Sequence, residues 1–399
     1  MSRFPSVKLS QVATVRSGFA FKSADWRAAG VPVIKIRNVT PGNVVLENCG
    51  FVSEDVAASA VAFEAQFGDS LISMSGATVG EIGRVRFDQR ALVNQRVGAF
   101  RVTFPTHLDS NYLYQFLQLP DTVDYFTSSA YGSAQPNISP SLILNIDIPL
   151  PPIQEQRAIA EVLGALDDKI AANTKLAETS LELTKTLFHK SILDVEFSDK
   201  SFADVAKVSG GGTPSTKVPE YWGGDTNWAT PTDVTALRGP YLEATSRPIT
   251  TEGLAACSSD LFQSGAILMT SRATIGAFAI AQVPTAVNQG FIVVEPNEPS
   301  MRYWLFHEML SRVDEFISLA NGATFLELSR GNFKKFKVRL AGSETMQSFE
   351  AKAIPLHSVA QNALKENSTL AATRDALLPQ LMSGKLCVKD AEALVSAAV

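Results

Sequence analysis

The sequence predicts an α+β protein in which two mixed α/β globules follow one another, each of them followed by a long helix. Three observations support this fold class. Four short motifs recur in the same order about 190 residues apart, β-like runs fill both halves, and an apolar stripe at helical spacing closes each half. A chain of 399 residues, 45% of them hydrophobic, is long enough to bury a sizeable core in each half.

The repeat is the strongest of these signals. Its shift varies only between 190 and 196 residues, as small insertions and deletions would produce. The matching segments are "LSQVATVRSG" from Leu9 and "FADVAKVSGG" from Phe202, "SGATVG" from Ser75 and "SRATIG" from Ser271, "VNQ" from Val93 and from Val287, and "GSAQPNIS" from Gly132 and "GATFLELS" from Gly322. The chain is therefore a tandem pseudo-repeat.

Strands are expected where short apolar runs lie between Gly, Pro and Asn turns. Such runs are "VPVIKIRNV", "DSLISMS", "GAILMTS" and "GFIVVEP". Residues 153–190 differ, because apolar side chains recur there at three, four and seven without an internal proline. We expect a helix of about 38 residues, roughly 57 Å long. Residues 349–381 carry a comparable stripe, in which Pro355 predicts a kink near the start.

A helix of this length has too narrow an apolar stripe for an ordinary core element, so it needs a partner helix along its length. Asn173 falls on the seven-residue register of Ile159, Leu166 and Leu187. Two interpretations stay open for it: a buried amide that fixes the alignment of the helices, or an amide turned to solvent.

The glycine-rich stretch "SGGGTPSTK", Ser209 to Lys217, contains the residue types of a phosphate-binding loop. A Walker loop places its lysine directly after the last glycine, whereas here Lys217 lies five residues beyond Gly212 with Pro214 between. We therefore expect no nucleotide site. The stretch instead predicts a tight surface turn.

Composition excludes several classes of site. Cys49, Cys257 and Cys387 are far apart and form no Cys-x-x-Cys pair, which excludes a zinc site and a disulfide framework. The four histidines, His107, His189, His307 and His357, stand alone in the sequence without ligand or triad spacing, so we expect surface or core roles. No cofactor is expected. No apolar run is long enough for a membrane span or a signal peptide, and we expect a cytosolic protein with no membrane partner.

The sequence resembles one known family, the specificity subunit of type I restriction-modification systems (HsdS). "IPLPPIQEQRAIAEVLGALDDKI" from Ile148 and "LLPQLMSGKL" from Leu377 are similar to its central and terminal conserved segments. "SGFAFKSADWRAAGVPVIKIRNV" and "SGGGTPSTKVPEYWGGDTNWATPTDV" resemble the starts of two different target-recognition domains. The resemblance covers essentially the whole chain.

The resemblance implies two target-recognition domains separated by an antiparallel coiled coil of two conserved helices. The implied boundaries are recognition domain 1 at 1–150, a central helical spacer at 151–197, recognition domain 2 at 198–340, a C-terminal helical spacer at 341–386 and a tail at 387–399. It also implies partners: double-stranded DNA, two methyltransferase subunits docked on the helices, and restriction (motor) subunits joined through them. The helix residues expected at the subunit interfaces are Ile159, Leu163, Leu166, Ile170, Leu176, Leu183, Leu187, Leu356, Leu364 and Leu377.

Two unlike globules on one spacer would read a bipartite, asymmetric DNA target, and cations and hydroxyls in their loops are the candidate contacts. The net charge of −5 does not exclude this, since phosphate binding depends on local charge. The candidates are Lys22, Lys35, Arg37, Arg84, Arg86 and Arg96 in the first domain, and Thr213, Ser215, Lys217, Arg272, Lys334 and Lys335 in the second. The recurring Asn-Gln pairs, Asn94-Gln95 and Asn288-Gln289, favour a structural hydrogen-bonding role because they persist in both halves.

Neither the motif of an adenine methyltransferase nor a carboxylate cluster beside a Walker loop is present, so we expect a non-catalytic subunit. Two other hypotheses remain. One is a coiled-coil scaffold that does not read DNA, and the other is a nucleotide-dependent enzyme built on the glycine-rich loop.

Overall fold

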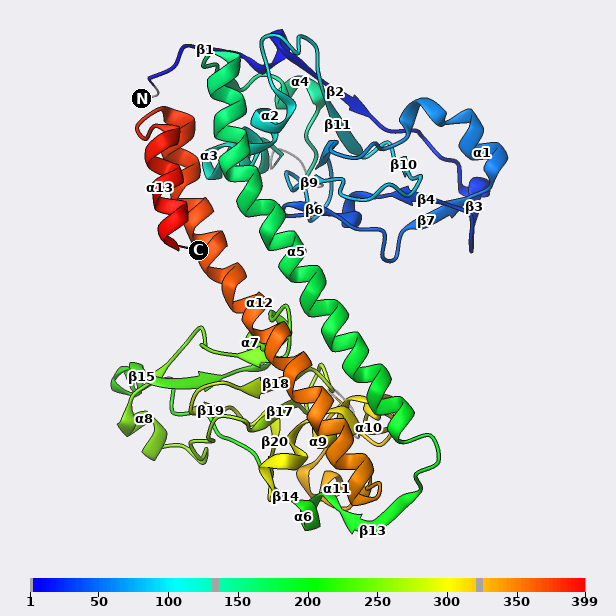
Figure 1. Ribbon diagram of the computed structural model, residues 1–399, viewed down its shortest axis with the longest axis vertical. Coiled ribbons are helices and arrows are strands. Elements are labelled where there is room, and N and C mark those ends of the chain that lie inside the picture. Colours follow the sequence, from blue (N-terminus) through cyan, green and yellow to red (C-terminus); the bar gives the residue numbers. More distant parts are fainter. Residues whose placement is uncertain (1–2, 131–135, 321–325, 399) are drawn as a thin grey trace. The chain divides into compact units, whose positions relative to one another are not determined.

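The computed structural model describes residues 3–130, 136–320 and 326–398 and divides into two compact units. The first unit comprises residues 1–170 and 369–399, and the second comprises residues 171–368. Two long helices, α5 (Ile153–Ser191) and α12 (Ser343–Ser383), contribute residues to both units (Figure 1). Both helices were predicted from the apolar periodicity. Helix α12 continues without interruption through Pro355.

The first unit is built on two four-stranded sheets. One has the order β2-β11-β8-β9 and the other β10-β4-β7-β3. The strand bounds are β2 (Ala13–Ser17), β11 (Val97–Val102), β8 (Ser70–Ser73) and β9 (Ile82–Arg84) in one sheet, and β10 (Leu92–Val93), β4 (Val31–Ile34), β7 (Gly50–Val52) and β3 (Trp26–Arg27) in the other. The short helices are α1 (Glu54–Ser59), α2 (Ser110–Leu117), α3 (Pro120–Ala130) and α4 (Pro140–Ile143). Strand β1 (Ser6–Lys8) pairs with β12 (Asp147–Pro149), and β5 (Val39–Thr40) pairs with β6 (Asn43–Val44).

The second unit repeats this plan. Its main sheet has the order β14-β20-β17-β18-β16, and β15 pairs in parallel with β19. The strand bounds are β13 (Phe197–Ser201), β14 (Ala206–Ser209), β15 (Trp222–Ala229), β16 (Tyr241–Leu242), β17 (Ile267–Thr270), β18 (Phe278–Ala281), β19 (Thr285–Val287), β20 (Phe291–Pro296) and β21 (Lys337–Arg339). The short helices are α6 (Phe202–Val205), α7 (Pro231–Thr235), α8 (Thr251–Ala255), α9 (Arg302–Leu310), α10 (Val313–Ser318) and α11 (Arg330–Phe333). The four predicted strand runs coincide with β4, β8, β17 and β20.

The tail beyond α12 forms a helix, α13 (Val388–Ala398), that the sequence did not lead us to expect. Ala391 is fully buried against the core of the first unit. The chain start lies beside the same corner, where the Arg3 amide donates to the Ser383 carbonyl at 2.8 Å. Phe4 packs close to Gly384, whose φ of +71° ends α12 in the left-handed conformation that favours glycine.

Polar contacts fix the alignment of α5 and α12. In the second unit, Asn173 is 4% exposed and donates to the Glu366 carboxylate at 2.7 Å, and Asn367 donates to the Thr174 hydroxyl at 3.0 Å. Both pairs are 193 residues apart, which lies within the 190–196 range of the repeat shift. Further along α5, Phe188 packs on Phe349, so the helix segments run antiparallel. Of the two interpretations of Asn173, the buried amide is confirmed.

Equivalent positions carry different chemistry where each globule packs on the helices. In the first unit the buried Asp167 carboxylate accepts from Gln115 and from Arg374, both at 2.9 Å, and Arg86 forms an ion pair with Asp168 at 2.5 Å. In the second unit a hydrogen bond of 2.7 Å, which the Gln361 side-chain amide donates to the Gln282 side-chain oxygen, takes the place of the Arg86–Asp168 pair. The contact is therefore charged in the first unit and neutral in the second.

His307 occupies the position of Gln115, and it does not stand alone as the sequence suggested. Its Nε2 lies 3.1 Å from Nε2 of His357, and Tyr241 reaches Nδ1 of His357 at 2.8 Å. This bond requires one imidazole to donate and the other to accept, which two imidazolium rings cannot do. Burial lowers the pKa of His307 and of His357 to about 3, and burial raises the pKa of the neighbouring Glu350 to about 7.

We expect the second unit to lose stability in mild acid. Below pH 6.5, His307 and His357 bind a proton each in the unfolded chain but stay neutral in the folded unit. Between pH 7 and 4.5, Glu350 binds one proton in the folded unit but is ionised in the unfolded chain. The unfolded chain thus gains about one net proton, and the free energy of unfolding should fall by about 1.4 kcal/mol per pH unit from 6.5 to 4.5, and about twice as steeply below that.

Urea unfolding at pH 7, 6 and 5 measures this slope. The double variant His307→Gln/His357→Gln should reverse it, because Glu350 then dominates the difference in proton binding; His107→Gln, at an exposed site of the first unit, is the control substitution. An unaltered slope in the double variant would contradict the assignment.

Candidate nucleic-acid interface

The recurring motifs converge on one place in each unit. In the first unit, the Phe19 amide donates to the Val93 carbonyl at 2.8 Å, and the Ile138 amide donates to the Met74 carbonyl at 2.9 Å. These contacts bring together the segments that begin at Leu9, Ser75 and Val93 with the end of the segment from Gly132. The second unit has the same contacts at Gly212 to Val287 (3.1 Å) and Leu328 to Ser271 (3.0 Å). Residues 132–135 and 322–325, the first part of the fourth motif, lie outside the described residues.

A polar hollow of 500 Å³ opens at this junction in the first unit. Its lining is Ser17, Met74, Ser75, Gln95, Arg96, Asn137, Ile138, Ser139 and Pro140. Ser75 forms the floor, is 7% exposed, and its hydroxyl has no hydrogen-bond partner among the described residues. Gln95, Arg96 and Asn137 are exposed. Within the described chain their side chains form no hydrogen bond or ion pair.

The second unit fills the same place with charged side chains. Arg272 and Glu327 form an ion pair at 2.8 Å with both side chains a little over two-fifths exposed, and they share a β-bridge as Ser75 and Asn137 do. The amide of Gly80 donates to Ser73 and that of Gly276 donates to Thr270, so the second loop is one residue shorter. In the structure, Arg272 is therefore equivalent to Ser75. The match of "SGATVG" with "SRATIG" instead pairs Ser75 with Ser271, one position earlier.

The Asn-Gln pairs divide into two roles. The side-chain oxygen of Asn94 accepts from the Arg96 amide at 3.3 Å, and that of Asn288 accepts from the Gly290 amide at 2.8 Å, so both asparagines hold the turn. This agrees with the structural role expected for them. Both glutamines, in contrast, are exposed, and the Thr213 hydroxyl donates a hydrogen bond to the Gln289 side-chain oxygen at 2.5 Å.

The glycines of "SGGGTPSTK" do not form a tight surface turn, and that prediction was wrong. Gly210 and Gly212 are buried and none of the three glycines has a positive φ. A Cβ on Gly211 would lie 1.8 Å from the Val287 carbonyl oxygen, and one on the equivalent Gly18 would lie 2.1 Å from that of Val93. Glycine is needed at both positions because the two backbone segments lie in direct contact and leave no room for a side chain. The exposed part of the stretch begins at Thr213 and includes Ser215 and Lys217.

The candidate cations of the first domain fall into two groups. Arg84 and Arg86 are engaged by side chains of their own unit: Arg84 hydrogen-bonds Asn111 and lies over the Tyr114 ring, and Arg86 pairs with Asp168. The other members, Lys22, Lys35, Arg37 and Arg96, are exposed or half-buried in loops and short turns. Lys22, Arg37 and Arg96 of this second group are exposed, whereas Lys35 is half-buried over the Trp26 ring.

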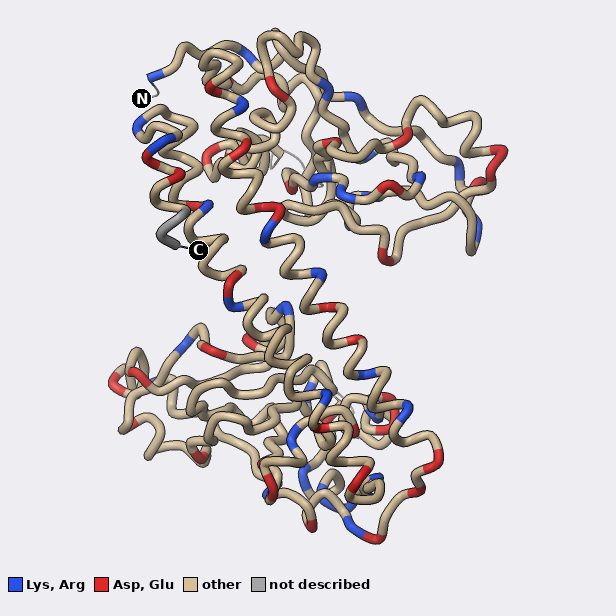
Figure 2. Tube along the Cα trace, in the orientation of Figure 1, with Lys and Arg blue, Asp and Glu red and all other residues tan. Residues whose placement is uncertain are grey.

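In the second domain, Thr213, Ser215, Lys217 and Arg272 lie in exposed loops, whereas Lys334 and Lys335 are exposed at the end of α11. Lysines and arginines alternate with acidic residues along both units (Figure 2). The interface is therefore not marked by a run of one charge.

A cation–aromatic pair recurs in both globules and was not foreseen as a pair. Lys35 Nζ lies 3.8 Å from the Trp26 ring centre, and Arg247 lies 3.6 Å from that of Trp222. The two tryptophans are 196 residues apart, within the repeat shift, but their cations come from different chain positions. Such a pair contributes about 0.5–1 kcal/mol at an exposed site.

The helix residues expected at subunit interfaces also divide. Ile159, Leu163, Leu166 and Leu377 are buried in the core of the first unit, and the partly buried Ile170 packs against it. Leu187, Leu356 and Leu364 are partly covered. Leu176 and Leu183, one heptad apart on α5, remain 48% and 46% exposed. They leave an apolar strip on the helix.

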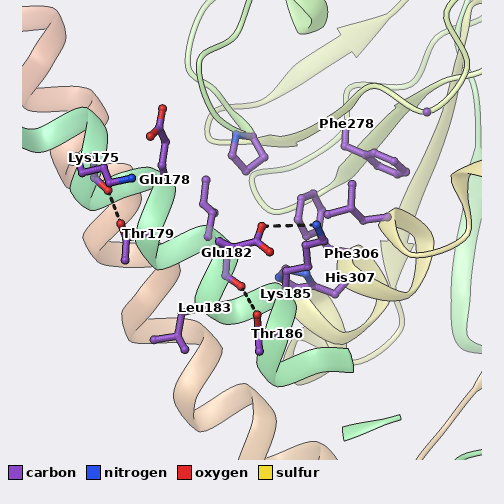
Figure 3. Close-up of a pocket in the computed structure, with 14 residues that line it drawn as sticks. Lys175, Glu178, Thr179, Glu182, Leu183, Lys185, Thr186, Phe278, Phe306 and His307 are labelled. Atoms are coloured by element: carbon purple, nitrogen blue, oxygen red, sulfur yellow. Dashed lines mark hydrogen bonds and ion pairs between the residues drawn. The ribbon is translucent and has the colours of Figure 1, made fainter. Parts of the chain in front are cut away.

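A cleft of 810 Å³ lies beside this part of α5, within the second unit (Figure 3). Phe278, Phe306 and His307 line its globule side, and Leu183 with polar residues of α5, among them Glu182 and Lys185, lines the other. His307 Nδ1 is buried and lacks a hydrogen-bond partner among the described residues.

The described residues lack both a metal-binding cluster and a membrane-spanning helix. They contain no group of three or more His, Cys, Asp or Glu side chains arranged to hold a metal ion. They also contain no helix that combines the length and the apolar character needed to cross a bilayer.

Comparison with known proteins identifies the family. The family described as "Type I restriction modification DNA specificity domain" matches residues 1–180 and 194–352. The chain belongs to this family. The two matched segments correspond to the two copies of the repeat, so the chain carries the specificity domain twice.

Individual relatives agree with this family. The MjaIX and MjaVIII type I restriction enzyme specificity subunits of Methanocaldococcus jannaschii are 34% and 31% identical over 173 and 176 residues. Each match covers 43% of this chain and only about two fifths of the relative, 40% and 41%. The type I restriction-modification S subunit from M. genitalium has a similar fold, with a TM-score of 0.61 at 16% identity over 95% of this chain and 96% of its own.

We expect Gly211→Ala to lower the free energy of unfolding by about 2–3 kcal/mol, because its methyl group would overlap the Val287 carbonyl. Gly331→Ala, where nothing lies within 4 Å of the added carbon, is the matched control. Thermal unfolding of the two variants compares them directly. Equal stability of the Gly211→Ala and Gly331→Ala variants would show that the backbone at residue 211 can move away from Val287 without loss of stability.

Proposed function

We propose that this chain is the DNA sequence-specificity subunit of a type I restriction-modification complex. Each globule reads one half of a bipartite, asymmetric DNA target, and the chain carries out no chemistry itself. The observation that carries this proposal is the double specificity-domain match, together with a junction that keeps equivalent backbone contacts in both globules and presents different exposed side chains. DNA is the substrate that such a pair of unlike surfaces fits.

The DNA contacts that we favour are the exposed Lys22, Arg37, Arg96, Thr213, Ser215, Lys217 and Arg272 and the half-buried Lys35, with Lys334 and Lys335 as phosphate contacts. Arg84 and Arg86 are left out: the Arg86 side chain is only 21% exposed in its pair with Asp168, against 44% for Arg272 in its pair with Glu327. The charged lysines and arginines would give the affinity a strong dependence on salt.

Two methyltransferase subunits are the proposed partners of the helices, and restriction subunits would join through them. The exposed Leu176 and Leu183 and the cleft beside α5 offer an apolar surface for one of them. A cytoplasmic location follows from a DNA substrate. The same helices would serve a scaffold that does not read DNA, so the DNA itself must be tested.

The decisive experiment maps adenine methylation across the genome of the source cell with and without this gene. We expect one bipartite motif to lose its methylation when the gene is deleted. An unchanged methylation map would contradict the proposed function. A complex that binds duplex without sequence preference would favour the scaffold, and ATP turnover by the purified chain alone would favour the nucleotide-dependent enzyme.

Docking on α5 predicts a separate result. Leu176→Asp/Leu183→Asp places two charges on the exposed strip and should reduce co-purification of a methyltransferase subunit by about 10-fold or more, since its apolar contacts would be lost. Leu193→Asp, at a side chain that is 77% exposed beyond the end of α5, is the control. Retention equal to that of the control would place the docking surface elsewhere.

A further inference from the structure

We propose that the polar hollow of the first unit reads a base edge in its DNA half-site, with Arg96 and Asn137 as the reading side chains. The inference rests on the proposed function and assigns the residues that determine specificity. It extends to the second unit, where Arg272 and Glu327 occupy the equivalent place.

The lining of the hollow has the chemistry of base readout. Arginine pairs with guanine O6 and N7, and asparagine or glutamine pairs with adenine N6 and N7. Arg96, Asn137 and Gln95 are exposed around the hollow, and within the described residues none of these side chains is engaged elsewhere. Among the described residues no carboxylate lines the hollow, so this lining carries no negative charge that would repel DNA.

The buried floor supports the same conclusion. Ser75 is 93% buried, yet its hydroxyl meets no protein partner within the described residues. A buried polar group without a partner is costly unless water or a ligand satisfies it. The hydroxyl oxygen is itself covered in this state, so an entering polar edge would supply the missing bond after the lining residues around it move aside.

Comparison of the two units separates the support from the reading side chains. The backbone that carries these side chains has the same contacts in both units. A glycine (Gly18 or Gly211) packs against a carbonyl, an asparagine (Asn94 or Asn288) holds the turn, and one β-bridge joins the two segments. The side chains around it are exchanged, since Ser75 and Asn137 are replaced by Arg272 and Glu327. A structural role would keep these side chains, whereas two domains that read different bases must change them.

The second unit should read different chemistry at this place. Arginine favours guanine, and glutamate accepts from the cytosine amino group. Arg272 and Glu327 are both a little over two-fifths exposed, so both can reach a base edge while they support each other. The two halves of the target should therefore differ where these surfaces meet DNA.

The test uses the full chain assembled with its methyltransferase subunits and a pool of randomised duplexes, and sequences the duplexes that are retained. Arg96→Ala and Asn137→Ala should each lower the preference at one base position of one half-site by roughly 5- to 150-fold and leave the other half-site intact. Arg272→Ala should do the same in the opposite half-site. Arg27→Ala, an exposed arginine of the first unit outside the hollow, should leave the motif unchanged.

The outcomes separate the two proposals. If the wild-type complex selects a bipartite motif and the Arg96, Asn137 and Arg272 variants select the same motif, base reading at the hollow is overturned while the proposed function stands. A uniform fall in retention with an unchanged motif would also overturn it, because it would assign these residues to phosphates. If the wild-type complex selects no motif, both proposals fail. Melting temperatures equal to wild type ensure that a lost preference reflects lost contacts.

Discussion

The alignment of the two long helices depends on a few polar contacts between residues that hold corresponding places in the two copies. Apolar stripes alone allow one helix to slide along another by a heptad, because leucines and alanines are interchangeable as partners. The amide of Asn173 cannot slide, since it is almost fully buried and needs the Glu366 carboxylate. A buried polar group of this kind costs stability and contributes specificity of alignment. The Asp167 carboxylate, held by Gln115 and Arg374, has the same effect in the first unit.

The two copies have kept this architecture while changing its chemistry. Where a globule packs on the helices, the first unit uses carboxylates and arginines, and the second uses amides, imidazoles and aromatic rings. Neutral hydrogen bonds are less sensitive to salt than ion pairs, and burial lowers the pKa of the second unit's two imidazoles so that they stay neutral. The two copies therefore share the geometry of this contact but differ in how strongly salt weakens it.

The sequence predicted the features that depend on local pattern. Apolar spacing located both long helices within a few residues, and alternating turns located β4, β8, β17 and β20. Contacts between distant segments could not be predicted in this way. Gly211 is a glycine because of Val287, and His307 is neutral because it is buried against His357, and neither partner is visible in the neighbouring sequence. Arg84 and Arg86 looked like surface cations for the same reason.

The loop that is one residue shorter in the second copy shows how this surface can vary without substitution. Both loops begin after an equivalent strand residue, Ser73 or Thr270, and return to an equivalent glycine, Gly80 or Gly276. Removing a single residue between these fixed points shifts every side chain in the loop by one place. A serine of the shared motif then leaves the bridge position and an arginine enters it. Loop length is thus a source of diversity in its own right, because one deletion can present new chemistry between flanking residues that keep their places.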